Sequence, residues 1–345
     1  MERKAERNES SPPTVVTVGS VRFGRDPFPV IAGPSSVEDP DQVRAAARAV
    51  AEGGGAVLRG GTVTGSTYGF AGLGMAGLDM LAAAAKEVGL PVVTQVAAPG
   101  DVEWVSDRVD MLEVGAGNMQ DFELLRAVGS SGKPVLLRRG PSATIDEWLW
   151  AAEYVLAGGN DKVVLVERGI RTFGDHGVTL DIGAIPMVKE RSHLPVLVDP
   201  SGPAAGTSRV PPLALAAQGV GADGLIVEVH AHPDQARSGG PSQLDASGFR
   251  ALMDVLGVGR MRREVDMVDR DIVRLLAERR RLAMAIGRVK AARGIPVYAP
   301  SREAELLEII RTEAEHHGLD PDHTVALFES ILEESRAAQR RARQE

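Results

Sequence analysis

Eight short apolar runs, each followed by a stretch of helical character, constrain the fold of this 345-residue chain more than any other feature. The runs are rich in β-branched residues and lack polar alternation, which is typical of parallel strands buried on both faces. In order, they read FPVIAG, AVLRG, PVVTQV, MLEVG, PVLLRR, KVVLVER, PVLVDP and GLIVEVH. Eight strand–helix units in about 230 residues predict an α/β TIM barrel rather than an open doubly wound sheet. No glycine-rich dinucleotide fingerprint follows the first run, which also disfavours the open sheet. Residues 16–24 predict a small hairpin ahead of the barrel.

The sequence changes in character after residue 256, where strand-like runs stop and charge density rises. Residues 256–294 carry apolar positions at helical spacing, over a length that is unusual for a globular helix. Pro300 and the pair Asp320-Pro321 fit the starts of two shorter helices. The sequence therefore predicts a disordered tail at 1–13, the barrel at 14–256 and an all-α three-helix domain at 257–345. One very long helix buries its apolar face poorly within three helices, so we expect this domain to dimerise.

Composition excludes several classes of partner. The net charge of −8 argues against nucleic acid and anionic membranes as main partners. The absence of cysteine excludes disulfides and thiolate chemistry. No apolar run reaches the roughly 20 residues of a membrane span, and the charged start MERKAERNESSPP lacks the apolar core of a signal peptide. We expect a cytoplasmic protein.

Two cations on one face of the predicted long helix point to an anionic ligand. Arg279 and Lys290 are eleven residues apart, which places them on the same side of the helix about 16 Å apart along its axis. A solvated face is the alternative for any such pair. Further polar residues accompany this one, however: Arg302 and Glu303 begin the second helix, and Ser335 and Gln339 lie one turn apart in the third.

This set of residues resembles the active site of the all-helical (AroQ-type) chorismate mutases, and the resemblance covers essentially all of 257–345. Seven polar positions match that family's site without a gap: Arg262, Arg279, Lys290, Arg302, Glu303, Ser335 and Gln339. Asp269, Gly287 and Pro296-Val297 also fall in register. Matches spread over three predicted helices are more specific than a single motif.

The resemblance implies conversion of chorismate to prephenate within aromatic amino acid or related specialised metabolism, without metal or cofactor. The reaction is a pericyclic rearrangement, so an enzyme holds a compact conformer and directs fixed donors at the ether oxygen, where negative charge develops. By the resemblance, Arg262 and Arg279 bind the two carboxylates, whose geometry suits a guanidinium fork. Lys290 and Gln339 would donate to the ether oxygen, and Glu303 would accept from the ring hydroxyl. Arg302 and Ser335 would support the site.

Helix geometry adds a constraint on the oligomer. Arg262 and Arg279 are 17 residues apart, about 25 Å along one helix, so one chain cannot bring both to one small molecule. If both bind chorismate, Arg262 comes from a partner subunit and a homodimer completes the site. One position departs from the family, since Ala299 stands where an Asp usually precedes the proline of the second helix. A side-chain cap worth about 1 kcal/mol is lost there, although the backbone N–H remains available to substrate.

Motifs along the predicted barrel resemble a second family, DAHP synthase of the short (type Iβ) kind, which shares its barrel with KDO8P synthase. The motifs IAGPSSVE, LRGG, YGFAGLG, NMQDFELLRAVG, KPVL, ERGIRTF, SHLPVLVDPS and VEVH occur in the family's order over about 28–245. That family joins phosphoenolpyruvate to erythrose 4-phosphate with a divalent metal held by Cys, His, Glu and Asp. The corresponding residues here are Ser35, Gly202, Glu228 and Gly239. One strong ligand does not hold an ion that prefers four to six.

Substrate-binding positions of that family also differ. The stretch TVTGST at 62–67 replaces a Lys-Pro-Arg-Thr segment, Gly117 replaces an arginine, and Arg138 replaces a lysine. The sequence retains Arg139, Glu167, Arg168 and Arg171, either as structural residues of the barrel rim or as a residual anion pocket. We predict a pseudoenzyme barrel that scaffolds or regulates the mutase and that could add higher oligomer contacts. The alternatives are a bifunctional DAHP synthase–chorismate mutase, a barrel repurposed for a metal-independent reaction, and a module that docks onto a genuine DAHP synthase.

Overall fold

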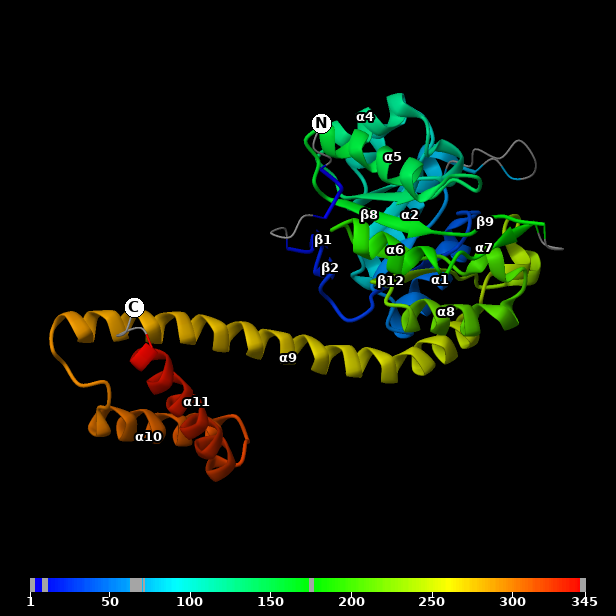
Figure 1. Cartoon of the computed structure of the whole chain (residues 1–345). Coiled ribbons are helices and arrows are strands. Elements are labelled where there is room, and N and C mark those ends of the chain that lie inside the picture. Colours follow the sequence, from blue (N-terminus) through cyan, green and yellow to red (C-terminus); the bar gives the residue numbers. More distant parts are fainter. Residues whose placement is uncertain (1–3, 8–11, 63–69, 71, 174–176, 342–345) are drawn as a thin grey trace. The chain divides into compact units, whose positions relative to one another are not determined.

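The computed structural model describes residues 4–7, 12–62, 70, 72–173 and 177–341; side chains are described outside 258–264 and 266. The chain divides into two compact units, Met1–Glu264 and Val265–Glu345 (Figure 1). This division falls within one continuous helix. The predicted boundary between 256 and 257 stays a prediction.

The first unit is a closed barrel of eight parallel strands, as the sequence predicts. Around the barrel, the strands follow the order β11, β12, β3, β4, β5, β6, β7, β8. They are β3 (Val30–Gly33), β4 (Val57–Arg59), β5 (Val92–Val96), β6 (Met111–Val114), β7 (Val135–Arg138), β8 (Val163–Glu167), β11 (Val196–Val198) and β12 (Gly224–Glu228). The remaining strands form two small antiparallel pairs, β1 (Val16–Val18) with β2 (Val21–Phe23), and β9 (Ile170–Arg171) with β10 (Val178–Thr179).

Helices cover the outside of the barrel (Figure 1). They are α1 (Pro40–Glu52), α2 (Gly74–Val88), α3 (Val102–Ser106), α4 (Phe122–Ser130), α5 (Ile145–Ala157), α6 (Ala184–Arg191), α7 (Ser201–Ala204) and α8 (Val210–Gly219). Short 3-10 turns lie at Pro99–Asp101, Ala116–Asn118, Thr207–Arg209, Pro233–Gln235 and Gly240–Ser242. Local sequence fixes several helix starts: the Asp39 side chain accepts from two backbone N–H groups of α1, and Thr144 with Glu147 forms a capping box on α5.

The hairpin β1–β2 closes the amino end of the barrel. Its side chains Val16, Val18, Val21 and Phe23 join one apolar cluster with inward-facing residues of the barrel strands. The hairpin glycine Gly19 approaches Pro91, which directly precedes β5, so the hairpin lies where the strands begin. With that end filled, polar groups inside the barrel gather at the carboxyl end.

Residues 4–7 differ from the predicted disordered tail, because they contact the barrel. Ala5 is buried, its N–H donates to the Glu153 carboxylate over 2.6 Å, and its carbonyl accepts from the Ser192 hydroxyl. Glu6 forms a β-bridge with Ser192. Composition alone did not predict these contacts, since they join residues far apart in the chain.

The long helix α9 spans Ala246–Ala292, so it begins ten residues before the predicted start at 256. The barrel's last helix and the long helix are one element, because nothing between 246 and 292 breaks a helix strongly. The helix contains no proline, and its four glycines, Gly248, Gly257, Gly259 and Gly287, each cost only about 1 kcal/mol in a helix. The second unit contains the rest of α9 with α10 (Pro300–His316) and α11 (Pro321–Arg341). It is the all-α three-helix domain that the sequence predicts.

We predict that Phe23→Ala will destabilise the barrel by about 3–5 kcal/mol, because a fully buried ring is removed from the closed end. Thermal and urea denaturation will measure the change. The neighbouring exposed residue supplies the control, since Val15→Ala is expected to cost less than about 0.5 kcal/mol. Equal effects of the two substitutions would contradict the conclusion that the hairpin side chains fill the amino end of the barrel.

Candidate functional sites

A cavity of about 330 Å³ lies at the carboxyl ends of the barrel strands. In TIM-barrel enzymes, this end carries the site. Six charged residues line the cavity: Arg59, Glu113, Arg138, Arg168, Asp199 and Glu228. Each belongs to, or directly follows, a different barrel strand. Three cations face three carboxylates, so the formal charges of the lining cancel.

Arg138 is the centre of the deepest charge cluster. Its guanidinium donates to Glu113 over 2.8 Å and also to Asp199, and all three side chains are almost fully buried. Burial alone would raise the pKa of both carboxyls, but the attraction of Arg138 holds each pKa below its usual range. Burial would lower the pKa of Arg138, and its two carboxylate partners reverse that effect and raise it. The cluster is therefore ionised and satisfied without a ligand.

A second ion pair joins Arg59 to Glu228 across the cavity. The Arg59 guanidinium lies 3.2 Å from Glu228 Oε1, and the two side chains are 11% and 16% exposed. Burial raises the pKa of Glu228, and the Arg59 charge opposes this only in part. Among the described residues, no hydrogen bond engages Glu228 Oε2. This pair is thus more accessible than the Arg138 cluster.

The four positions predicted to correspond to metal ligands, Ser35, Gly202, Glu228 and Gly239, lie at this end of the barrel, but their side chains do not suit a metal ion. A β-carbon built on Gly239 would lie 2.8 Å from Ser35 Cβ and 2.9 Å from Glu228 Oε2. A β-carbon on Gly202 would lie 3.3 Å from the Arg168 guanidinium, so a cation borders the fourth position. Within the described part of the chain, no group of three or more His, Cys, Asp or Glu side chains could hold a metal. Glu228 and a neutral serine hydroxyl are too few donors for a divalent ion.

The loop that carries Gly239 is held against Ser35 by hydrogen bonds. The Ser35 N–H donates to the Gln243 amide oxygen over 2.8 Å, and the Ser238 hydroxyl donates to the Ser36 hydroxyl over 2.7 Å. The Arg237 N–H donates to Glu38 over 2.7 Å. The close approach of Gly239 to Ser35 and Glu228 is therefore a fixed feature of the cavity.

The predicted residual anion residues separate into two groups. Arg168 lines the cavity and, among the described residues, has no hydrogen bond or ion pair. Arg139 pairs with Glu167 over 2.8 Å and with Asp181 over 2.9 Å, and Arg171 lies in β9. Neither residue lines the cavity. The ion pairs of Arg139 fit the structural alternative, and a residual anion pocket at Arg168 stays a prediction.

Other predicted barrel positions lie on the cavity wall, and the sequence analysis missed three charged residues that also line it. Gly117 lines the cavity with open space where a side chain would project. Of the stretch 62–67, only Thr62 lies within the described residues; it is buried. Arg59, Glu113 and Asp199 were not predicted as site residues. Their signal is a charge at the end of an apolar run, as in AVLRG, MLEVG and PVLVDP.

In the second unit, α11 brings together residues of α9 and α10. The Arg279 guanidinium donates to the Ser335 hydroxyl and, over 3.3 Å, to the Ile331 carbonyl. One turn further along α11, at Gln339, this helix passes close to α9. A β-carbon on Gly287 of α9 would lie 2.9 Å from Gln339 Cα. The two helices therefore touch at backbone distance, which requires glycine at 287. The Oε1 atom of Gln339 is buried without a hydrogen-bond partner in the described structure.

The predicted residues around the start of α10 lie beside the same stretch of α11. Lys290 Nζ donates to the Val297 carbonyl over 2.8 Å. Glu303 forms an ion pair with Arg336, whose guanidinium lies 5.6 Å from the centre of the Tyr298 ring. Arg336 was not predicted, although it directly follows Ser335. Its signal was the i, i+3 spacing to Gln339, which places both on neighbouring faces of one helix.

Two predicted residues lie away from this convergence and one lies outside the described side chains. Arg302 pairs with Glu305 over 3.1 Å at the surface and is 70% exposed. Ala299 is the N-cap of α10 and makes no side-chain hydrogen bond, as its substitution for Asp implies. Arg262 belongs to α9, but its side chain is among those not described.

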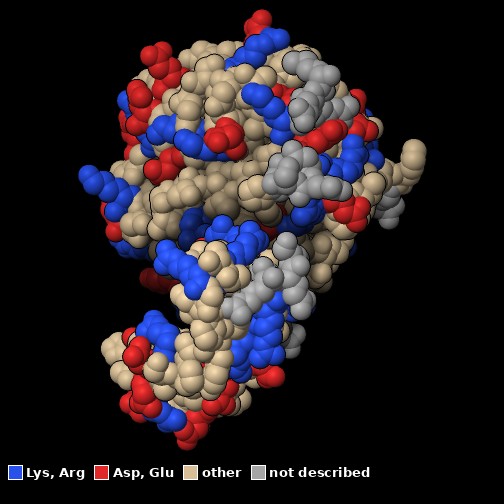
Figure 2. Space-filling model, turned by 60° about the vertical axis from the view of Figure 1, so that its left-hand side comes forward, with Lys and Arg blue, Asp and Glu red and all other residues tan. Residues whose placement is uncertain are grey.

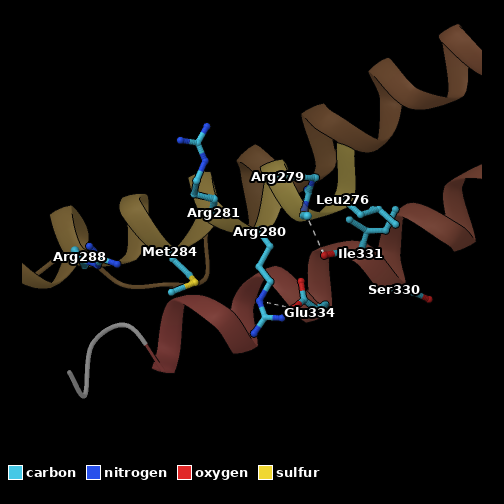
Figure 3. Close-up of a pocket in the computed structure, with 10 residues that line it drawn as sticks. Leu276, Arg279, Arg280, Arg281, Met284, Arg288, Ser330, Ile331 and Glu334 are labelled. Carbon is cyan, nitrogen blue, oxygen red and sulfur yellow. Dashed lines mark hydrogen bonds and ion pairs between the residues drawn. The ribbon is translucent and has the colours of Figure 1, made fainter. Parts of the chain in front are cut away.

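A cavity of about 610 Å³ lies between α9 and α11. Most of the predicted site residues do not line it. Arg279 is the predicted site residue that lines it, together with Arg280, Arg288 and Met284. Figure 3 shows Arg279 and Arg280 directed towards α11, where Arg280 lies 3.5 Å from Glu334, whereas Arg281 points away. The cavity places four arginines next to one acidic residue, so its wall is basic.

A row of large apolar side chains on α9 is only partly covered within the described chain. Between 39% and 66% of each side chain is exposed. The row comprises Val265, Val268, Ile272, Val273, Leu275, Leu276, Leu282, Ile286 and Val289.

None of the described helices is long and apolar enough to cross a membrane.

Comparisons with known proteins assign both units to families. Residues 6–257 match the DAHP synthetase I family, and residues 261–340 match chorismate mutase type II. A phospho-2-dehydro-3-deoxyheptonate aldolase of Thermotoga maritima is 45% identical over 255 residues, covering 71% of this chain and 75% of the relative. A 2-dehydro-3-deoxyphosphooctonate aldolase of Magnetococcus marinus is 32% identical over 277 residues, covering 73% and 95%.

The fold comparison agrees with the sequence comparison. The crystal structure of DAHP synthase from Thermotoga maritima superposes with a TM-score of 0.72 at 41% identity and covers 77% of each chain. The truncated form of the same enzyme gives 0.69, covering 76% of this chain and 96% of that one. The chain therefore belongs to the DAHP synthetase I family through its barrel, and it carries a chorismate mutase type II domain after it.

Proposed function

We propose that the helical domain catalyses the rearrangement of chorismate to prephenate. The observation that carries this proposal is the convergence on one stretch of α11. Ser335 meets Arg279 there, Arg336 meets Glu303, and Gln339 meets α9 at Gly287. Residues from three helices thus bring several donors and one carboxylate, that of Glu303, to this stretch of α11. The match to chorismate mutase type II over 261–340 supports the same substrate.

The geometry leaves donors available for a dicarboxylate. Arg279 uses one guanidinium nitrogen for Ser335 and Ile331, which leaves its other N–H groups for a carboxylate. Lys290 uses one of its three N–H bonds on the Val297 carbonyl. The buried Gln339 amide has an unsatisfied oxygen, and the free-energy cost of such an atom falls when the amide, in either orientation, gains a partner. These fixed groups would stabilise charge developing on the ether oxygen without transferring a proton.

The proposal predicts chorismate consumption in EDTA-treated protein, measured by ultraviolet absorbance. Arg279→Ala and Lys290→Ala are each expected to reduce the rate about 10²–10³-fold, since each removes a donor directed at negative charge. Arg274→Ala is the matched control on the same helix, because Arg274 is 64% exposed and pairs only with Asp271 among the described residues. An absent reaction in the parent protein, or normal rates in both folded variants, would refute the proposed function.

Arg336 is expected to position Glu303 rather than touch substrate. Without Arg336, the Glu303 carboxylate is no longer held in place to accept from the ring hydroxyl. That hydrogen bond would form equally in the substrate complex and in the transition state. We therefore expect Arg336→Ala to raise KM about tenfold with a smaller change in kcat, and Arg336→Lys to restore part of the loss. The exposed Arg340 supplies the control variant Arg340→Ala. A fall in kcat at constant KM would show that Arg336 acts on the transition state instead.

We further propose that the domain works as a homodimer. The half-exposed apolar row on α9 supports this, because its burial against a second copy would remove more apolar area from water. The 17-residue separation of Arg262 and Arg279 supports a site completed by the partner subunit.

Mixing Arg262→Ala protein with Arg279→Ala protein tests the shared site. In a mixed dimer, one site carries both substitutions and the other carries neither. If subunits exchange freely, half of the dimers are mixed, and activity should recover towards about one quarter of the parent value. Labelled subunits would verify exchange by mass. Exchange without recovery would place both arginines in a site built from one chain.

For the barrel, two proposals rest on different observations. Family membership and 45% identity to a DAHP synthase favour a bifunctional protein, the alternative of the sequence analysis, and nothing in the comparisons supports a loss of activity. The side chains at the metal and phosphate positions favour the main interpretation, a barrel without DAHP synthase activity. Ser35, Gly202 and Gly239 supply no strong ligand there.

On these side chains we expect no turnover of phosphoenolpyruvate with erythrose 4-phosphate in Mn²⁺, Co²⁺ or Zn²⁺ buffers. The physical reason is that one carboxylate does not bind such an ion tightly. Release of phosphate from phosphoenolpyruvate, measured beside the mutase reaction in the same preparation, gives the answer. Turnover that depends on added metal would establish the bifunctional protein.

A further inference from the structure

Gln339 differs from the other proposed donors of the helical site in how its side chain is held. Arg279 donates to the Ser335 hydroxyl, and Lys290 Nζ donates to the Val297 carbonyl over 2.8 Å. The Gln339 side chain makes no hydrogen bond with any described residue, and its buried Oε1 is left without a partner. The position of its amide is therefore set by the stretch of α11 backbone that carries it.

That stretch of α11 lies directly against α9 at Gly287. A β-carbon built on Gly287 would lie 2.9 Å from Gln339 Cα, 3.0 Å from the Gln339 carbonyl oxygen and 3.2 Å from Gln339 Cβ. The two nearest atoms belong to the backbone, so a side chain at 287 could fit only if one of the helices moved. Gly287 does not adopt a positive φ, and glycine is less favourable than alanine inside a helix. The close approach, rather than the backbone conformation, is therefore what requires glycine here.

The same contact brings Gln339 close to the position of Lys290. Lys290 follows Gly287 by three residues, and positions three apart are neighbours on the surface of a helix. Gln339 thus meets α9 beside the residue that would donate to the same oxygen atom of the substrate. Figure 2 shows acidic and basic side chains interspersed over the visible surface, which does not by itself favour a dianion. The placement of single donors within the site is therefore important for this substrate.

We propose that Gly287 is a positioning residue of the mutase, because its lack of a side chain lets α11 hold the Gln339 amide where it and Lys290 donate to one ether oxygen. This inference rests on the proposed function of the helical domain. A methyl group at 287 would have to retreat to an ordinary carbon–carbon contact of about 3.5–4.0 Å. The resulting displacement, about half an ångström or more, would carry the amide away from the oxygen on which negative charge develops. Since that charge is largest in the transition state, the loss should appear in kcat rather than in KM.

A double-substitution cycle on the full-length protein tests this inference, with kcat and KM for chorismate measured in each variant. Gly287→Ala should lower kcat about 10–100-fold with little change in KM, and Gln339→Ala should lower kcat about 10²–10³-fold. In the Gln339→Ala background, Gly287→Ala should have almost no further effect, because the amide that it displaces is absent. A glycine with a purely structural role would lower the rate by the same factor in both backgrounds.

Two further variants complete the test. Gly257→Ala is the matched control, because Gly257 is also a glycine of α9 but a β-carbon there would meet no described atom within 4 Å. It should leave kcat and KM unchanged. Gln339→Asn keeps Gly287 and withdraws the amide from α9 by one methylene, so it should lower kcat about as much as Gly287→Ala does. Circular dichroism will show whether each variant folds, and Gln339→Asn carries the test if Gly287→Ala does not.

Three results would each overturn the inference. The two substitutions of the cycle could lower kcat by independent factors, Gly287→Ala in its folded form or Gln339→Asn could leave kcat unchanged, or Gly287→Ala could act on KM alone. Each of these results would leave the proposed function of the domain intact. A parent protein that does not consume chorismate would instead refute the proposed function itself, so the two failures are distinguishable.

Discussion

Closure of the barrel is the constraint on which the first unit depends. Eight parallel strands in a ring place all their carboxyl ends on one rim, while the hairpin side chains fill the opposite end. Charged residues at the strand ends therefore lie together in one cavity. A buried charge without a partner there would cost folding free energy. The pairing of Arg138 with Glu113 and Asp199, and of Arg59 with Glu228, satisfies most of them. Arg168 makes no hydrogen bond or ion pair with a described residue, but its charge helps to lower the pKa of Asp199.

In the helical unit, the cationic side chains also have hydrogen-bond partners, but these partners carry no charge. Its donors are held by backbone carbonyls and a serine: Arg279 by Ser335 and Ile331, and Lys290 by Val297. These partners are uncharged, so the cations keep their attraction for an anion. In the barrel, by contrast, carboxylates neutralise two of the three arginines. Arginines thus have uncharged partners in the helical site and carboxylate partners in the barrel cavity.

Sequence reasoning succeeded where the signal was local. A parallel strand buried on both faces produces a continuous apolar run, and all eight barrel strands were predicted from such runs. The start of α9 at Ala246 was missed because the change in composition at 256 marks the end of the barrel's strand-like runs but not a break in the helix. Arg59, Glu113 and Asp199 were missed because their partners are distant in the chain: Arg138 reaches across 25 residues to one carboxylate and 61 to another. Arg336 was missed because its role depends on the packing of α11 against α10, which its neighbours in sequence do not reveal.

The central claim for the barrel is that its charges are balanced by its own side chains rather than by a metal ion. Electron paramagnetic resonance of Mn²⁺ titrated into the full-length protein measures this directly, because binding removes the signal of the free ion. The account predicts that the signal of free Mn²⁺ persists through one equivalent per chain, in the parent and in Glu228→Gln alike. Loss of that signal at one equivalent in the parent, restored by Glu228→Gln, would contradict it and place a metal at the carboxyl end of the barrel.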